Sequence, residues 1–198
     1  MSFAEMLRSE FRDLQLDVSA SSLHQLVLYA TEIEHWNKTV NLTSLRGRSL
    51  VRRLIVDPVW AGQHLQMKGS MADVGSGNGS PGIPLCVTRE FALTHLIEPR
   101  MRRAAFLRHV ISKLGLTGVA VNKCRIEEMP DKTLSLEWIT LQAIDPTPEL
   151  IGALRRIATK TTHVVWMTSV EASPVANSLK LEIPGSNTKI WVFRLDQI

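Results

Sequence analysis

Cysteine is scarce in this sequence of 198 residues: there are two, Cys86 and Cys124, and no Cys-x-x-Cys pair. This scarcity excludes a disulfide scaffold and a cysteine-rich zinc site. The six histidines also lack the close spacing of metal ligands, so we expect no bound metal. No apolar run approaches the roughly 18 residues that would span a membrane, and we expect no membrane contact.

The first residues do not predict a secretory signal either. Such a signal places basic residues ahead of an apolar stretch, whereas residues 1–14 mix acidic, basic and apolar side chains. Together with the few cysteines, this indicates a reduced, cytoplasmic protein. The length suits one domain with a helical extension rather than two large domains, and we expect a monomer.

The charge is only mildly basic. Lys and Arg number 23 against 19 Asp and Glu, for a net charge of +4, which permits a nucleic-acid partner without requiring one. The basic residues gather in two segments without an acid: residues 46–53 hold four arginines, and residues 100–113 hold five lysines and arginines. Such segments fit either contact with a polyanion or two solvated helix faces.

The spacing of apolar residues changes along the chain, from a helical pattern to short apolar runs alternating with helical segments. Apolar residues at helical spacing predict helices over residues 2–16 and from about 20 to 36, and a third over 48–66 that Pro58 must kink or split. From Met71 onward, short apolar runs alternate with helical segments. The predicted strands are 71–75, 91–98, 118–123, 137–143 and 162–169. The predicted helices between them are 83–90, 101–115 and 147–158, and a β-hairpin follows over 178–195.

Alternation of strands and helices predicts the α/β class with a mostly parallel sheet. The terminal hairpin adds antiparallel strands at the edge of this sheet. We divide the chain into an N-terminal helical subdomain, residues 1–67, and an α/β domain, residues 68–198.

The most informative segment is the loop DVGSGNGSPG, from Asp73 to Gly82, which follows the first predicted strand. Ligands of open α/β sheets bind beyond the carboxyl ends of the strands, and glycines let the backbone approach a ligand without a Cβ clash. Residues 77–82 fit the dinucleotide fingerprint GxGxxG, so an NAD(P)-dependent oxidoreductase stays open. An acid two residues ahead of GxGxG is instead typical of methyltransferases that use S-adenosylmethionine (SAM). Pro81 and Pro84 also lack the N–H groups that a pyrophosphate needs.

Two further segments favour a nucleoside ligand. Glu98 ends the second predicted strand, and a carboxylate there can accept two hydrogen bonds from a ribose diol. The third strand leads into residues 124–128, a loop that borders the adenine in methyltransferases. Ile126 could pack on the ring, and the backbone near Glu127 could bond its edge.

Together these segments resemble the RsmG (GidB) family of bacterial methyltransferases that act on 16S ribosomal RNA. The resemblance extends from about residue 20 to 130 and rests on Trp36-Asn37-Lys38 with Asn41-Leu42-Thr43-Ser44, on Asp73-Val74-Gly75-Ser76-Gly77 with Pro81-Gly82-Ile83-Pro84-Leu85, on Glu98 with Arg102-Arg103-Ala104-Ala105-Phe106-Leu107, and on Arg125-Ile126-Glu127-Glu128. It implies a doubly wound, Rossmann-like methyltransferase fold, SAM as methyl donor, and transfer to N7 of a guanine in small-subunit ribosomal RNA.

From these motifs and this resemblance we expect two sets of binding residues. The cofactor-binding set is Asp73, Gly75, Ser76, Gly77, Gly79, Ser80, Glu98, Pro99, Arg100, Ile126, Glu127 and Gln142. The RNA-binding set is Asn37, Lys38, Asn41, Arg46, Arg48, Arg52, Arg53, Arg102 and Arg103, with ribosomal RNA or the small ribosomal subunit as partner. For Trp36 we prefer core packing to base stacking.

The chemistry requires no catalytic side chain that we can single out. Guanine N7 already offers a lone pair, so in-line methyl transfer needs positioning and electrostatics rather than a general base. The target guanine would lie unstacked or in a single-stranded loop.

The chain departs from the family pattern at several positions. Gln142 stands where the family usually has an arginine, Thr168 where it has a lysine, and Ser80 where it has an apolar loop residue. The histidine usual before the family's Asp-Ser is replaced in the segment Arg52 to Pro58. Lost cations at a ligand-binding edge weaken phosphate contacts. The alternative function is therefore a non-catalytic RNA- or ribosome-binding module of the same fold.

Overall fold

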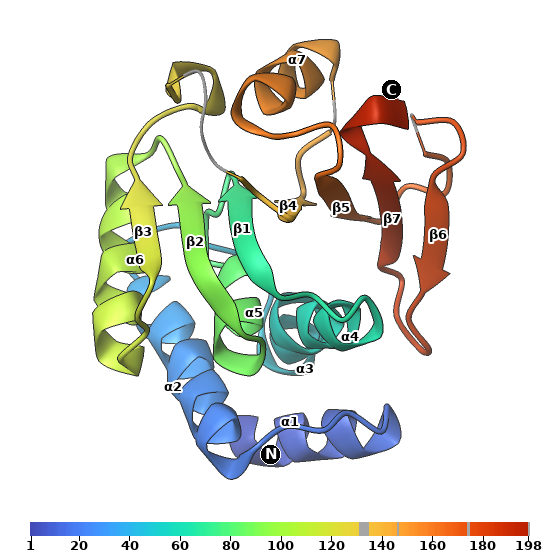
Figure 1. Cartoon of the computed structure of the whole chain (residues 1–198). Helices are drawn as coiled ribbons and strands as arrows, with labels where there is room; N and C mark the ends of the chain where they lie inside the picture. Colours follow the sequence, from blue (N-terminus) through green and yellow to red (C-terminus); the bar gives the residue numbers. More distant parts are fainter. Residues whose placement is uncertain (131–134, 146, 174, 198) are drawn as a thin grey trace.

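The computed structural model describes residues 1–130, 135–145, 147–173 and 175–197. The strands in these residues are β1 (Gly69–Val74), β2 (Phe91–Ile97), β3 (Val119–Asn122), β4 (Trp138–Gln142), β5 (His163–Thr168), β6 (Leu179–Glu182) and β7 (Lys189–Arg194). They form one sheet in the order β3-β2-β1-β4-β5-β7-β6 (Figure 1). β1 to β5 pair in parallel, and β7 pairs antiparallel with both β5 and β6. The expected α/β class with a C-terminal antiparallel hairpin is confirmed.

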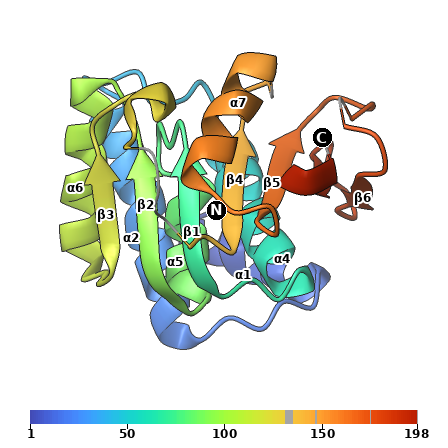
Figure 2. The ribbon, with the colours of Figure 1, turned by 45° about the horizontal axis from the view of Figure 1, so that its top comes forward.

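The helices cover the two faces of the sheet unequally. They are α1 (Phe3–Asp13), α2 (Ala20–Trp36), α3 (Gly47–Val51), α4 (Asp57–His64), α5 (Gly82–Thr88), α6 (Met101–Leu114) and α7 (Pro148–Ile157), with shorter helical turns η1 (Arg52–Val56), η2 (Ile126–Glu128) and η3 (Leu195–Gln197). α7 lies in front of the sheet in Figure 2, and the helices from α1 to α6 lie behind it. Within the described residues, no helix is long and apolar enough to cross a membrane.

Helix ends follow ordinary capping chemistry. Ser2 forms a reciprocal capping box with Glu5 at the start of α1, and the hydroxyl of Ser19 accepts the N–H of Ser22 at the start of α2. Gly115 ends α6 in the left-handed conformation, which glycine adopts without steric cost. Local sequence therefore fixes these boundaries.

One core joins the N-terminal helices to the sheet. Leu26 of α2, Ile55 of η1, Met71 of β1 and Phe106 of α6 belong to the same buried apolar cluster. The predicted division between residues 67 and 68 therefore stays a prediction, because the main core contains side chains from both sides of it.

The third predicted helix, residues 48–66, is interrupted before Pro58 rather than at it. Residues Arg52–Val56 form a π-helical turn, in which the N–H of Asp57 donates to the carbonyl of Arg52. Pro58 then lies at the second residue of α4, directly after the π-helical turn. Because proline has no N–H, it cannot donate a hydrogen bond back to that turn. This turn directs the neighbouring residues Arg52 and Arg53 to different surroundings.

Arg52 is part of a buried ion network. Its guanidinium donates to Oε2 of Glu10 in α1 (2.5 Å) and to Oδ1 of Asp57 (3.1 Å), and its side chain is 15% exposed. Asp57 is fully buried. Its Oδ2 accepts hydrogen bonds from Ser186 (2.7 Å) and Thr188 (2.6 Å) ahead of β7. The network thus joins α1, η1 and the C-terminal hairpin.

This arrangement corrects one expectation. The sequence predicts that Arg52 contacts RNA, but its donors face two carboxylates inside the protein. Burial raises the pKa of Asp57, and the neighbouring Arg52 cation opposes this effect. Arg52 is therefore a structural residue.

Replacing Arg52 with Met keeps the apolar length of the side chain but leaves the buried Asp57 without its cation, and Glu10 with only the exposed Arg48. We expect the free energy of unfolding to fall by about 3–5 kcal/mol, measured by urea denaturation. The matched control is Arg48→Met, because Arg48 binds the same Glu10 (2.7 Å) but is 67% exposed. It should cost at most about 1 kcal/mol. Equal losses in the two variants would show that burial of the network is unimportant.

Candidate functional site

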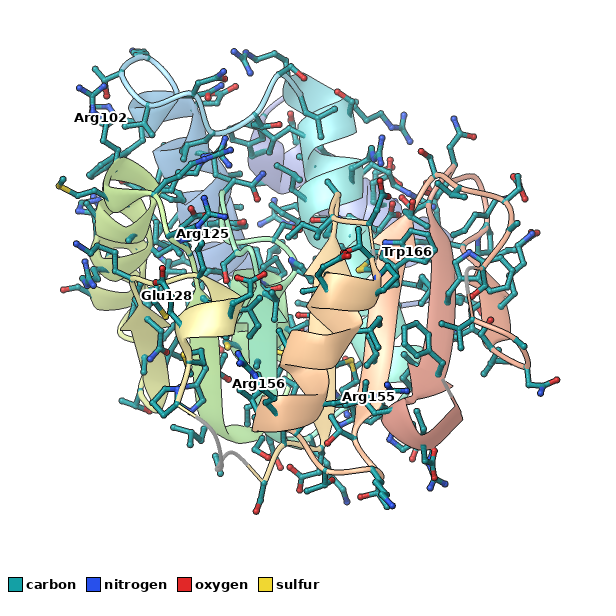
Figure 3. The ribbon with its side chains drawn as sticks, turned by 90° about the horizontal axis from the view of Figure 1, so that it is seen from above. Arg102, Arg125, Glu128, Arg155, Arg156 and Trp166 are labelled. Atoms are coloured by element: carbon teal, nitrogen blue, oxygen red, sulfur yellow. The ribbon has the colours of Figure 1, made fainter. Side chains whose placement is uncertain are left out.

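A cleft of about 570 Å³ opens at the carboxyl edge of the parallel strands. It lies between the glycine loop after β1, the segment after β2, the end of β4, the turn η1 and the loop of residues 42–45. Figure 3 looks down on this edge. The predicted cofactor residues that line the cleft are Gly75, Ser76, Gly77, Ser80, Glu98, Pro99, Arg100 and Gln142.

A smaller, more apolar pocket of about 310 Å³ adjoins the cleft. The predicted residues Ile126 and Glu127 line it, on the η2 turn where Figure 3 labels Arg125 and Glu128. The two cavities share Gly75, Pro99 and Ile144. A polar cleft joined to an apolar pocket suits a ligand with a polar chain and a flat ring.

Glu98 organises the floor of the cleft. Its carboxylate is 3% exposed. Oε2 accepts the N–H of Gly77 (2.9 Å), and Oε1 accepts the N–H of Arg100 (2.8 Å). Because each carboxylate oxygen has two lone pairs, both retain capacity for a ligand hydroxyl. Glu98 therefore both holds the glycine loop and offers acceptors to a ligand.

Asp73 lies beneath the glycine loop rather than on the cleft wall. Its carboxylate is fully buried, and Oδ1 accepts the hydroxyl of Thr140 (2.8 Å). Among the described residues, its Oδ2 has no hydrogen-bond partner. Burial raises the pKa of Asp73 to about 6. The hydroxyl of Ser76 donates to the Asp73 carbonyl (2.8 Å), so Asp73 supports the loop through its main chain.

Gly79 faces the protein interior, like Asp73, rather than the cleft. A Cβ at this position would lie 2.8 Å from Ile83 and 3.2 Å from the hydroxyl of Tyr29. The cleft is therefore bounded by the first half of the glycine loop and by Ser80, whereas Gly79 permits close packing against α2.

Ile144 is a site residue that sequence reasoning missed. A Cβ on Gly75, whose φ is +72°, would lie 2.0 Å from Cδ1 of Ile144. The main-chain carbonyl of Ile144 accepts the indole N–H of Trp166 on β5 (2.9 Å), a residue labelled beside α7 in Figure 3. No motif marks an isoleucine after the fourth strand, so only its place in the fold reveals that it separates the cleft from the apolar pocket.

The side chain of Asn37, in the motif Trp36-Asn37-Lys38, forms hydrogen bonds within the protein. Asn37 accepts the N–H groups of Leu42 (2.8 Å) and Thr43 (3.1 Å), and its amide donates to the Thr43 carbonyl (2.7 Å). These bonds hold the loop that forms one wall of the cleft, and the RNA contact expected of Asn37 stays a prediction. Trp36 packs edge-on against the ring of Phe106, with ring centroids 5.7 Å apart, which supports the packing interpretation.

Two of the remaining predicted RNA residues line the cleft. Arg53 and Arg103 are partly buried and line it, and Arg103 donates to the Asn41 carbonyl (2.9 Å). Figure 3 labels Arg102 near the start of α6. Thr168, by contrast, is buried at the end of β5 and is not a lining residue of the cleft. The predicted RNA-binding residues that are exposed are Lys38, Asn41, Arg46, Arg48 and Arg102. In the cofactor-binding set, the exposed residues are Pro99, Arg100 and Glu127.

In the part of the chain that the structure describes, no group of three or more His, Cys, Asp or Glu side chains could hold a metal ion. Cys86 and Cys124 are both free thiols. Burial raises the pKa of Cys86 to about 12, a value that disfavours the reactive thiolate.

Comparison with known proteins gives consistent matches. Residues 22–179 match the model of the family GidB, rRNA small subunit methyltransferase G. The ribosomal RNA small subunit methyltransferase G of Xylella fastidiosa is 37% identical over 131 residues, which cover 66% of this chain and 61% of that protein. The protein of the same name from Halorhodospira halophila is 32% identical over 150 residues, which cover 75% of this chain and 70% of that protein. This chain thus matches less than two thirds of the length of the Xylella protein.

A solved structure shares the fold. A SAM-dependent methyltransferase from Aquifex aeolicus superposes with a TM-score of 0.56 at 15% sequence identity, covering 82% of this chain and 97% of that one. At such low identity the likeness concerns the fold alone. It agrees with the parallel sheet and antiparallel hairpin described above.

The buried Asp73 carboxylate predicts a pH dependence of stability. Its pKa of about 6 exceeds the ordinary value of 3.8, so the folded state holds this proton more tightly than the unfolded state. The resulting stabilisation is complete below pH about 4 and is lost as the pH rises through about 6, a change of about 3 kcal/mol. Asp73→Asn should remove this loss.

The measurement is urea denaturation of both proteins between pH 4 and pH 8. The control is Asp17→Asn, because Asp17 is exposed. Parallel stability curves for the wild type and Asp73→Asn would contradict the assigned burial effect.

Proposed function

Since the chain belongs to the family of rRNA small subunit methyltransferase G, we propose that it transfers a methyl group from SAM to N7 of a guanine in small-subunit ribosomal RNA. The observation that carries the proposal is the meeting of Glu98, the glycine loop and Ile126 at one edge of the sheet. We also propose that the protein acts as a cytoplasmic monomer on 16S ribosomal RNA or the small ribosomal subunit.

The residues present fit SAM. The free lone pairs of Glu98 suit the ribose hydroxyls. The apolar pocket at Ile126 suits the adenine, and the polar cleft at Gly75 and Gly77 admits the methionine chain. A side chain at Gly75 would fill this space, because its Cβ would meet Ile144.

Bound SAM supplies an activated methyl group. The protein's residues need only bind and orient the reactants, because the N7 lone pair of guanine attacks without losing a proton. The cationic side chains Arg53, Arg100 and Arg103 in the cleft wall suit the phosphates of a strand whose guanine is unstacked. The floor built around Glu98 keeps the cofactor's ribose in one place.

One observation favours the non-catalytic alternative. Gln142 at the end of β4 donates its amide to the carbonyl of Arg53 (3.2 Å) and brings no charge to the cleft. A module that binds RNA without methyl transfer needs no further cation there. The oxidoreductase alternative has less support, because Pro81 and Pro84 occupy the beginning of α5, where a pyrophosphate needs N–H donors.

Calorimetric titration of the full chain with SAM, and with NAD⁺ as control, tests the proposal first. We expect micromolar SAM binding and no NAD⁺ binding, followed by methyl transfer to guanine N7 in 16S ribosomal RNA, supplied naked and as the assembled small subunit. SAM binding or salt-dependent RNA binding without methyl transfer would support the non-catalytic module. Binding of NAD⁺ alone would overturn the methyltransferase assignment.

Glu98→Gln tests the ribose contact. An amide NH₂ cannot accept the N–H that the lost oxygen accepted, so SAM affinity should fall about tenfold or more. The matched control is Glu34→Gln, because Glu34 is exposed and lines neither the cleft nor the apolar pocket. It should bind SAM as the wild type does. An unchanged dissociation constant for Glu98→Gln would remove Glu98 from the cofactor site.

A further inference from the structure

Arg53 is a cation without an anion. Its side chain is partly buried and lines the cleft. Among the described residues, no hydrogen bond or ion pair of its guanidinium is present. Such a group in a cleft wall has five N–H donors available for a ligand.

The main chain fixes where Arg53 stands. The preceding residue, Arg52, is held by Glu10 and Asp57, and the carbonyl of Arg53 accepts the amide of Gln142 (3.2 Å). Neighbouring residues of a helical turn project in different directions, so the anchored Arg52 leaves Arg53 facing the cleft. Arg53 is thus positioned by a buried network rather than by a flexible surface loop.

The charge of the cleft favours an oxyanion. Three arginines line it, Arg53, Arg100 and Arg103, against one carboxylate, Glu98. Both oxygens of Glu98 accept main-chain N–H groups, and among the described residues no ion pair joins Glu98 to Arg53. A ligand with its own negative charge would complete the site.

We propose that Arg53 binds an oxyanion of a ligand in this cleft and thereby positions the reacting groups. Two sources offer this chemistry: the methionine carboxylate of SAM and a phosphate of the target RNA strand. The inference rests on the proposed function. It adds that the first two residues of the turn η1 have different roles: Arg52 stabilises the fold, and Arg53 binds the ligand.

The experiment compares the full-length wild type with Arg53→Gln, which removes the charge. The matched control is Arg46→Gln, because the guanidinium of Arg46 donates to the carbonyls of Thr43 and Leu45 and is not part of the cleft lining. Three probes are titrated: SAM, 5′-methylthioadenosine, which lacks the carboxylate, and a single-stranded RNA oligonucleotide containing guanine. Methyl transfer then gives KM for SAM and for RNA.

A carboxylate contact predicts that Arg53→Gln weakens SAM about tenfold but leaves methylthioadenosine unchanged. A phosphate contact predicts unchanged SAM affinity with RNA affinity about tenfold weaker and a raised KM for RNA. Arg46→Gln should move SAM and methylthioadenosine by less than about twofold. Either pattern in Arg53→Gln supports the proposal. Changes below twofold for every probe would overturn it while the proposed function stands.

Two measures keep the test decisive. If Arg53→Gln does not fold, Arg53→Lys replaces it: it keeps the charge but loses the planar fork, so it should show the same pattern with a smaller loss. If the wild type binds ligands but transfers no methyl group, the proposed catalysis fails, and the SAM and RNA titrations still decide the role of Arg53.

Discussion

A guanidinium buried between two carboxylates is the contact on which the rest of this structure depends. Arg52 bridges Glu10 and Asp57, and Asp57 in turn accepts two hydroxyl donors near β7. Taking such charges out of water is costly, so each partner is required by the others. The cluster therefore determines how the first helix, the π-helical turn and the last hairpin sit together. The same turn holds Arg53 at the cleft, so a structural ion network places a candidate ligand-binding cation.

The glycine loop depends on a second carboxylate, that of Glu98. Its two oxygens accept hydrogen bonds from N–H groups of the loop after β1 and of the start of α6. Asp73 lies below the same loop with its charge buried, whereas Asn37 holds the opposite wall. Each wall of the cleft is thus held by side-chain to main-chain bonds. A cleft built in this way is preformed and does not need a ligand to shape it.

Much of the fold could be predicted from sequence, because short apolar runs, glycine and proline are local signals. The meeting of Gly75, Glu98 and Gln142 at one edge could also be predicted, since parallel strands bring their carboxyl ends together. The roles of Arg52 and Asn37 could not, because their partners are set by tertiary contacts that no local pattern encodes. Ile144 carries no motif, and the inward turn of Asp73 and Gly79 depends on packing against Thr140 and Tyr29.

The sheet order has a consequence for synthesis on the ribosome. β7 is inserted between β5 and β6. The hydroxyl partners of Asp57 are Ser186 and Thr188, which lie 129 and 131 residues after Asp57 in the chain. A nascent chain that has made the glycine loop and β1 to β5 still lacks these partners. Contacts between such distant segments form slowly, because a long loop must close first. The ion network behind η1 is therefore completed late, so an unfinished chain contains every cleft-lining residue before the contacts that hold η1 are complete.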